Sequence, residues 1–200
     1  MNKPPLIPRA PFTGLPFSSA SGRGVLAADR DGLGIATILV RKGQLNALSS
    51  RVRERFGIEL PSGPYRVAAG DVAFAGVAPG SWLVTSEIDS HRFAASLKEG
   101  LGAVAAVADQ SSGYAVLRLT GPKLREALAK VLPVDLHPRS FRTGDVLATL
   151  ASHVSATLWR LQDAADGSPV FEVAVYRSFA ASFWHSLASS AAEFGFVPGG

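Results

Sequence analysis

Apolar residues recur along the chain with periods of about two and about 3.6 residues, which predict strands and helices respectively. Short apolar runs of strand length lie at residues 35–40, 72–78, 82–85 and 104–108. A first helix is indicated by apolar residues at helical spacing, namely Leu45, Leu48, Val52 and Phe56. It ends at Gly57, and a second helix runs from a cap at Asp89 or Ser90 to Gly100. The order β-α-β-β-α-β over residues 34–112 predicts a first α+β lobe of the ferredoxin-like, split β-α-β kind.

A similar order of elements begins again at Tyr114 and predicts a second α+β lobe over residues 113–194. The candidate strands are residues 114–120, 146–151, 154–161 and 170–176. One helix starts at Gly121-Pro122 and ends at Pro133, and another spans about 178–192. We expect mainly antiparallel sheets with helices packed on one face of each. Residues 195–200 are expected to form a frayed tail.

Residues 1–33 are rich in Pro and Gly and predict an extended N-terminal arm without regular structure. The arm nevertheless carries apolar side chains, namely Leu6, Ile7, Phe12, Leu15 and Phe17. Such side chains can anchor a segment in a groove of another protein, and we expect the arm to extend from the body and to be ordered mainly by a larger subunit. The alternative is that they cover the core of this chain.

Composition excludes several classes of protein. Hydrophobic residues make up 47% of the 200-residue chain, which excludes a disordered protein, and charged residues make up 18%, against about 25% in a typical soluble domain. The low charge predicts a surface that is partly covered by another protein. Cysteine is absent, which excludes disulfides, thiolate metal sites and a cysteine nucleophile.

The net charge of +4 is concentrated in the first 60 residues, where nine basic residues face four acidic ones. The densest cluster, Arg51, Arg53 and Arg55, indicates a solvated or partner-facing helix side, and no basic stripe with aromatic residues predicts nucleic-acid binding. Five prolines within the first sixteen residues argue against a signal peptide, and no apolar run is long enough to span a membrane. We therefore expect a cytoplasmic protein.

No catalytic or metal-binding pattern is present in the sequence. The four histidines, His91, His137, His153 and His185, are too far apart for ligand spacing, and we expect no metal site. The chain lacks G-x-S-x-G and a P-loop, and Gly32-Leu33-Gly34 precedes a strand, whereas a dinucleotide loop follows one. A binding or structural protein is therefore favoured over a free-standing enzyme.

Residues 116–145 nevertheless resemble the gamma subunit family of heterotetrameric sarcosine oxidase. The similarity lies in the Leu119-Thr120-Gly121-Pro122 helix start and in the stretch Leu136-His137-Pro138-Arg139. The flanking segments 79–84 and 175–184, PGSWLV and VYRSFAASFW, agree with it. The resemblance covers roughly residues 30–190.

That family is distantly similar to the folate-binding T-protein of glycine cleavage. In the T-protein, an Asn-Asp pair follows the Gly-Pro helix, and its carboxylate faces the folate. The matching pair here is Val134-Asp135, so Asp135 is the candidate for the folate side. The asparagine is missing, and the chain lacks the later portion that closes the folate pocket.

The resemblance implies a gamma subunit without a catalytic centre that acts in assembly or stability. Such a complex oxidises sarcosine to glycine with release of hydrogen peroxide and passes the one-carbon unit to tetrahydrofolate. FAD, FMN, NAD, zinc and tetrahydrofolate are then expected in the partner alpha, beta and delta subunits, and this chain is expected to bind no cofactor. Two alternatives remain, namely a stand-alone folate-dependent one-carbon protein that uses Asp135, and the equivalent subunit of an N-methylglutamate dehydrogenase-type complex.

Overall fold

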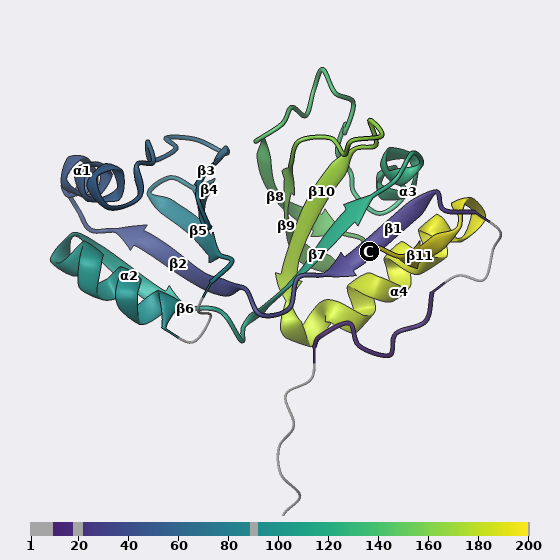
Figure 1. Cartoon of the computed structure of the whole chain (residues 1–200), viewed down its shortest axis with the longest axis horizontal. Helices are drawn as coiled ribbons and strands as arrows, with labels where there is room; N and C mark the ends of the chain where they lie inside the picture. Colours follow the sequence, from purple (N-terminus) through teal and green to yellow (C-terminus); the bar gives the residue numbers. More distant parts are fainter. Residues whose placement is uncertain (1–9, 18–21, 89–91, 200) are drawn as a thin grey trace, which may run out of the picture.

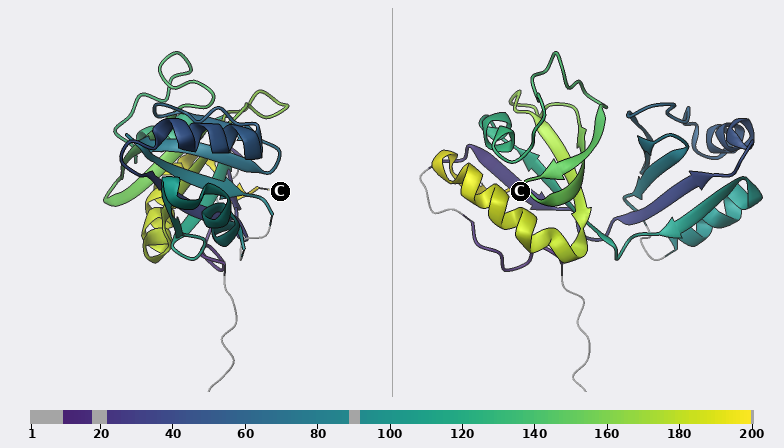
Figure 2. Two further views of the ribbon diagram at one scale, coloured as in Figure 1. Left: turned by 90° about the vertical axis from the view of Figure 1, so that its left-hand side faces the viewer. Right: turned by 180° about the vertical axis from the view of Figure 1, so that it is seen from behind.

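Two β-sheets with helices on their outer faces make up the protein (Figure 1). The computed structural model describes residues 10–17, 22–88 and 92–199. The sheets are dominated by antiparallel pairing, which confirms the predicted α+β class with two ferredoxin-like lobes. Figure 2 shows that the lobes diverge as a V, with the helices on the outside.

The sheet of the first lobe has the strand order β3-β4-β5-β2-β6. Its strands are β2 (Gly34–Val40), β3 (Arg66–Ala69), β4 (Val72–Ala78), β5 (Ser81–Ser86) and β6 (Ala105–Asp109). Helices α1 (Leu45–Phe56) and α2 (Phe93–Leu101) cover one face. Alternate strand residues such as Ile38, Phe74 and Val84 point under these helices and are fully buried, because a β-strand turns successive side chains to opposite faces.

Of the two helix ends predicted for the first lobe, the one at Gly57 is confirmed and the other is wrong. Gly57 follows α1 with a φ of 66°, and its N–H donates to the carbonyl oxygen of Arg53 at 2.8 Å. The predicted end of α2 at Gly100 is wrong, because the helix continues to Leu101 and into a 3-10 turn, η1 (Gly102–Val104). Leu101 is fully buried, so burial of this residue favours one more helical position. The predicted caps Asp89 and Ser90 lie outside the described residues.

The sheet of the second lobe has the order β11-β1-β7-β10-β9-β8. Its strands are β1 (Val25–Asp29), β7 (Tyr114–Thr120), β8 (Val146–Ala151), β9 (Val154–Arg160), β10 (Val170–Tyr176) and β11 (Phe196–Pro198). Helices α3 (Leu124–Ala129) and α4 (Ala180–Ala191) cover one face, and the 3-10 turns η2 (Arg177–Phe179) and η3 (Ala192–Phe194) flank α4. Helix α3 ends before the predicted Pro133, although Val131 and Leu132 after it remain buried.

Two expectations about the chain ends are wrong. Residues 25–29, assigned to the arm, form β1, which pairs antiparallel with β7, and residues 196–198, assigned to a frayed tail, form β11, which pairs parallel with β1. Both strands are short, but each completes its ladder with a segment far away in sequence. The proposed domain limits of 34–112 and 113–194 otherwise stay a prediction.

The described part of the arm before β1 lies against the second lobe instead of extending away. The ring of Phe12 is 5% exposed and lies 5.7 Å from the ring of Trp184, centroid to centroid. The indole N–H of Trp184 donates to the carbonyl oxygen of Pro16 at 2.8 Å. Burial of an aromatic ring outweighs the cost of ordering a few residues, so residues 10–17 cover this chain's own core.

The Gly121-Pro122 turn holds the start of β1 against the start of α3. Gly121 has a φ of 125°, and a Cβ atom there would lie 2.4 Å from the carbonyl oxygen of Gly24. The N–H of Lys123 donates to the same oxygen at 2.9 Å. Glycine is therefore required at 121 for both the backbone conformation and the close approach.

The helix-free faces of the two sheets meet in a small apolar core. It consists of Leu33, Ile35, Ala75, Leu83, Val116, Val146, Trp159 and Ala174. Beside this core, an isolated antiparallel bridge between Tyr65 and Asp145 joins the lobes, and elsewhere the sheets separate (Figures 1 and 2). Among the described residues, no helix is long and apolar enough to cross a membrane.

Candidate functional site

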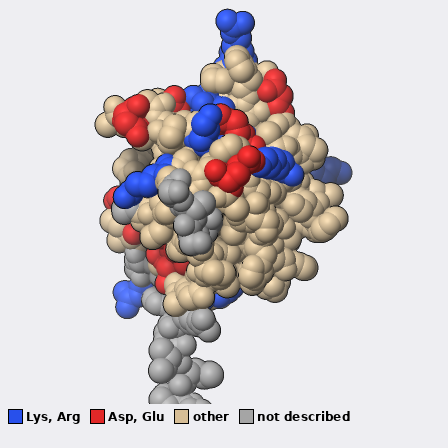
Figure 3. All heavy atoms as spheres, turned by 90° about the vertical axis from the view of Figure 1, so that its right-hand side faces the viewer, with Lys and Arg blue, Asp and Glu red and all other residues tan. Residues whose placement is uncertain are grey.

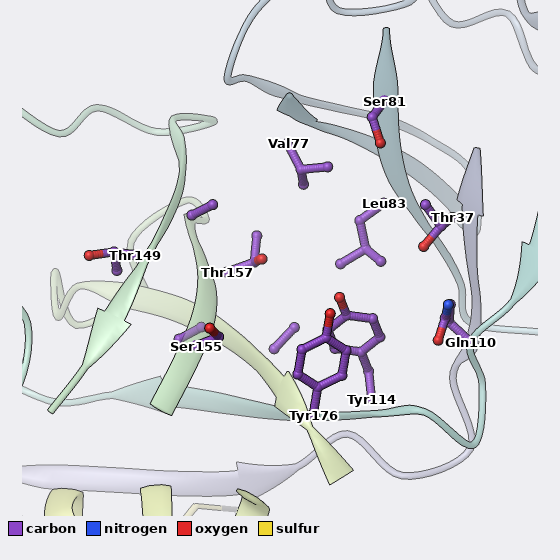
Figure 4. A pocket seen from close by; sticks show the side chains of 13 residues that line it. Thr37, Val77, Ser81, Leu83, Gln110, Tyr114, Thr149, Ser155, Thr157 and Tyr176 are labelled. Carbon is purple, nitrogen blue, oxygen red and sulfur yellow. The ribbon is translucent and has the colours of Figure 1, made fainter. Parts of the chain in front are cut away.

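An open cleft of about 660 Å³ lies at the point where the two sheets separate. The first lobe contributes Thr37, Val77, Ser81 and Leu83, and the segment that links the lobes contributes Gln110. The second lobe contributes Tyr114, Ala148, Thr149, Ser155, Ala156, Thr157, Ala174 and Tyr176. Figure 4 shows the walls facing each other across the cleft, with the two tyrosines at its base.

None of the residues that line the cleft carries a charge. Ser81 and Thr37 on one wall, and Ser155 and Thr157 on the other, present hydroxyl groups, each of which can donate and accept a hydrogen bond (Figure 4). The remaining lining residues are the uncharged polar Gln110, Thr149 and the two tyrosines, together with the apolar residues Val77, Leu83, Ala148, Ala156 and Ala174. The cleft can therefore bind uncharged groups that both donate and accept hydrogen bonds, but it offers no counter-ion for a charged one.

The two tyrosines at the base of the cleft form a stacked pair. Tyr114 begins β7 and Tyr176 ends β10, and they are directly paired across the two strands. Their ring centroids are 4.8 Å apart with an interplanar angle of 23°. Burial, together with the hydrogen bond to the Tyr176 hydroxyl, raises the pKa of the Tyr114 phenol well above its ordinary value. Tyr114 therefore stays neutral and serves as a hydrogen-bonding group.

A cluster of charged residues lies on the same face of the second sheet, beyond the apolar core. The carboxylate of Glu172, 4% exposed, accepts hydrogen bonds from Arg30 Nε at 3.1 Å, Arg118 Nε at 2.9 Å and Trp159 Nε1 at 2.8 Å. Arg30 also pairs with Glu87, which follows β5 of the first lobe. The cluster thus fastens one lobe to the other with ion pairs.

Arg66 on β3 adds a further positive charge to this cluster. Burial, and to a lesser extent the nearby Arg118 and Arg30, lower the pKa of its guanidinium, whereas Glu172 and Glu87 act in the opposite direction. The guanidinium groups therefore outnumber the carboxylates at the junction, and Glu172 is the buried group that compensates them.

Asp135, the candidate for the folate side, lies in the exposed loop between α3 and β8 and does not line the cleft. Its Oδ1 accepts a hydrogen bond from the backbone N–H of His137 at 2.9 Å. The hydroxyl of Ser140 and this N–H lower the pKa of the carboxyl group. The described contacts thus give the carboxylate a part in shaping its own loop, and its role toward folate stays a prediction.

The arginines of α1 mostly contact the same lobe. Arg51 Nη1 donates to the carbonyl oxygen of Leu101, and Arg55 Nη2 donates to the hydroxyl of Ser96 at 2.7 Å. Arg53 pairs with Glu59 at 2.5 Å on the surface. Arg51 and Arg55 therefore join α1 to α2, whereas the side chain of Arg53 is 65% exposed.

The outer end of the second lobe carries charges of both signs, which are interspersed over part of it, while a broad area has no charged side chain (Figure 3).

Within the described residues, no group of three or more His, Asp or Glu side chains is arranged to hold a metal ion. His137 is one of the four histidines that the sequence predicts to lie too far apart to bind a metal together. Its Nδ1 accepts a hydrogen bond from the backbone N–H of Arg139 at 3.2 Å. His91 lies outside the described residues.

Sequence reasoning missed the cleft because its residues come from several elements of both sheets. No motif joins Thr37 and Ser81, on paired strands of the first sheet, to Thr157, which faces them only when the two sheets come together. The one usable signal was the presence of serine and threonine at alternate positions of otherwise apolar strands.

Comparison with known proteins assigns the chain to a family. Residues 43–193 match the sequence profile of the "Sarcosine oxidase, gamma subunit family". The chain belongs to this family. A relative from Corynebacterium sp. (strain U-96), "Sarcosine oxidase subunit gamma", is 30% identical over 142 residues, which cover 69% of this chain and 66% of the relative. The match thus spans about two thirds of that relative's length.

A solved sarcosine oxidase contains a chain of similar architecture. A chain of the heterotetrameric sarcosine oxidase from Corynebacterium sp. U-96, solved in complex with pyrrole 2-carboxylate, matches with a TM-score of 0.78 and 25% identity. The match covers 94% of this chain and 96% of that chain. The glycine cleavage aminomethyltransferase T from Bartonella henselae matches with a TM-score of 0.60 and 12% identity, over 84% of this chain and 46% of that chain, which shows a likeness of fold.

Proposed function

We propose that this protein is the gamma subunit of a heterotetrameric sarcosine oxidase-type complex and acts there in assembly or stability. The observation that carries the proposal is the match over nearly the full length of both chains to a component of a heterotetrameric sarcosine oxidase. The neutral cleft supports the non-catalytic part, because it offers no titratable group suited to acid–base chemistry at neutral pH.

In this proposal, oxidation of sarcosine to glycine, release of hydrogen peroxide and one-carbon transfer to tetrahydrofolate take place on the alpha, beta and delta subunits, which also carry FAD, FMN, NAD and zinc. The complex is placed in the cytoplasm. The equivalent role in an N-methylglutamate dehydrogenase-type complex uses the same surfaces of this chain, because the N-methyl substrate binds a partner.

Co-expression with candidate alpha, beta and delta subunits tests the proposal. We expect the chain to co-elute with them in size-exclusion chromatography, and omission of the chain to lower the yield of assembled, sarcosine-oxidising complex. The isolated chain is expected to be colourless and inactive. Stoichiometric flavin absorbance in the isolated chain, or an unchanged complex without it, would contradict the proposal.

The alternative of a stand-alone folate-dependent protein is tested separately by titrating the isolated chain with tetrahydrofolate. The glutamate carboxylates of a folate require basic partners, and the cleft has none. We therefore expect no saturable heat of binding in calorimetry. Binding that is lost in Asp135→Asn would favour the folate alternative instead.

A further inference from the structure

The cleft of about 660 Å³ between the two sheets remains without an assigned role. We propose that it receives an uncharged segment of a partner subunit, whose backbone amides bind the hydroxyl-lined walls. The inference rests on the proposed function, because it names the surface through which a subunit of a complex is held.

Charge is the first argument for this occupant. A free amino acid is a zwitterion, and nucleotide and folate cofactors carry phosphates or carboxylates, so each of them would require counter-ions in the cleft. On this face of the second sheet the charged residues are gathered beyond the apolar core, in the cluster around Glu172, where Arg30 and Arg118 pair with the carboxylate. A peptide backbone is neutral and presents an N–H donor and a C=O acceptor at each residue, which the serine and threonine hydroxyls of both walls can pair with.

Size and shape are the second argument. The volume of about 660 Å³ lies within the roughly 300–1,000 Å³ of typical binding sites, and small side chains such as Ala148, Ala174 and Ser155 leave the walls open. The base is formed by flat tyrosine rings, and Tyr176 is 46% exposed. Tyrosine is enriched at protein interfaces because one side chain offers both an apolar ring and a hydrogen-bonding hydroxyl.

The rim of the cleft is the third argument, and it separates a polypeptide from a small ligand. Leu39 follows Thr37 by two positions on β2, and Leu150 follows Ala148 by two positions on β8, so each leucine continues the wall on the same strand face. Both leucines are 53% exposed. A small molecule inside the cleft would leave both in water, whereas a protein segment that continues past the rim covers them.

A second copy of this chain fits the cleft less well than a partner subunit. The loop that projects from the second lobe between α3 and β8 carries Asp135, Arg139 and Arg142, all exposed (Figure 1). Such a charged loop does not match uncharged walls. The occupant is therefore assigned to another subunit, in a segment without Asp, Glu, Lys or Arg.

The absence of cysteine from the chain makes a direct test possible. Ser155→Cys places one thiol on the exposed cleft wall, and Ser189→Cys and Ser50→Cys place one on the outer faces of α4 and α1. Each variant is labelled with a maleimide, first as the isolated chain and then in the assembled complex. We expect the cleft thiol to react in the isolated chain and its labelling rate to fall at least tenfold in the complex, while at least one outer thiol keeps its rate.

The occupant is identified by attaching a benzophenone maleimide to the Ser155→Cys variant, irradiating the complex and sequencing the cross-linked peptide by mass spectrometry. A peptide of a partner subunit that is free of charged residues supports the inference. A second copy of this chain, a charged peptide or the absence of a cross-link overturns it. Protection already present in the isolated chain also overturns it, because the occupant would then belong to this chain.

A filled cleft provides the complementary measurement. Ser155→Trp adds a large ring at an exposed wall position, and Ser189→Trp adds the same ring on the outer face of α4. We expect the cleft variant alone to weaken association with the partners by at least tenfold while both variants keep the wild-type melting temperature. If the Ser155→Trp variant co-elutes with the partners at wild-type affinity, or if the cleft thiol is labelled freely in the complex, only this inference is overturned. If the wild-type chain does not co-elute with the partners, both the proposed function and this inference are overturned.

Discussion

At the residue scale, the junction of the lobes depends on a single buried carboxylate. Glu172 faces the guanidinium groups of Arg30 and Arg118, and its second oxygen accepts the indole N–H of Trp159. Removing one member of a buried pair leaves the others desolvated and unpaired, which costs more than the pair itself contributes.

We predict that Glu172→Gln lowers the free energy of unfolding by about 2 kcal/mol. Breaking a buried pair costs roughly 3–5 kcal/mol, and the value here is smaller because the side chains of Arg30 and Arg118 keep 22% and 39% exposure. Urea unfolding followed by circular dichroism measures the change. The control Glu59→Gln removes a surface partner of Arg53 and should leave the midpoint unchanged. Equal effects of the two substitutions would refute the role given to Glu172.

The raised pKa of Tyr114 predicts how the stability of the protein changes at alkaline pH. The pKa of Tyr114 is raised in the folded chain, mainly by burial and then by the hydrogen bond to Tyr176, whereas the unfolded chain ionises near the ordinary value of 10.0. Above that pH the unfolded state binds fewer protons than the folded state, so stability is fully present below pH 10 and falls as the pH rises further.

We expect Tyr114→Phe to flatten this alkaline loss of stability, measured as urea midpoints between pH 9 and pH 11. The matched variant Tyr65→Phe removes a hydroxyl from a tyrosine that is 46% exposed and should keep the wild-type slope. A slope that is unchanged in Tyr114→Phe would show that this phenol ionises as readily in the folded chain as in the unfolded one.

At the scale of elements, the sequence predicted the long apolar strands and missed the short ones. Residues 114–120 and 146–151 were predicted at their observed limits, because β-branched and leucine residues recur there. Strands β1, β3 and β11 are short. The partners of β1 and β11 are distant in sequence, which no local pattern reveals, whereas β3 has only four residues and pairs with the adjacent β4. Local patterns did not predict the cleft either, because its walls belong to different sheets.

The Gly121-Pro122 turn before α3, which carries part of the family resemblance, has a physical reason. We predict that Gly121→Val destabilises the protein by about 3 kcal/mol, since valine adds strain at a φ of 125° and a clash with the carbonyl oxygen of Gly24. The control Gly167→Val sits at a φ of 80° with nothing near its Cβ and should cost about 1 kcal/mol, from backbone strain alone. Thermal unfolding compares the two, and a Gly121→Val cost no larger than the control would disprove the close-approach argument.

At the scale of the whole molecule, the two lobes are joined by the inter-sheet core and by the pair between Arg30 and Glu87. We therefore predict one unfolding transition, with coincident circular dichroism and tryptophan fluorescence curves. Ile35→Asn places a polar amide in the inter-sheet core, where Ile35 is 3% exposed, and should separate the curves into two steps. Leu39→Asn, on the same face of β2 but 53% exposed, should keep a single step, and two steps in the unaltered chain would contradict the coupling.

The position of β1 has a consequence for the order in which the protein is made. Strand β1 leaves the ribosome first, yet it pairs with β7 and β11, which lie on the far side of the whole first lobe in sequence. The first lobe can fold as soon as β6 emerges, and β1 can then pair with β7, which follows β6 directly, but the other edge of β1 stays open until β11 has been made. During that interval the early strand exposes a free edge, and nascent chains are most vulnerable to aggregation and proteolysis there.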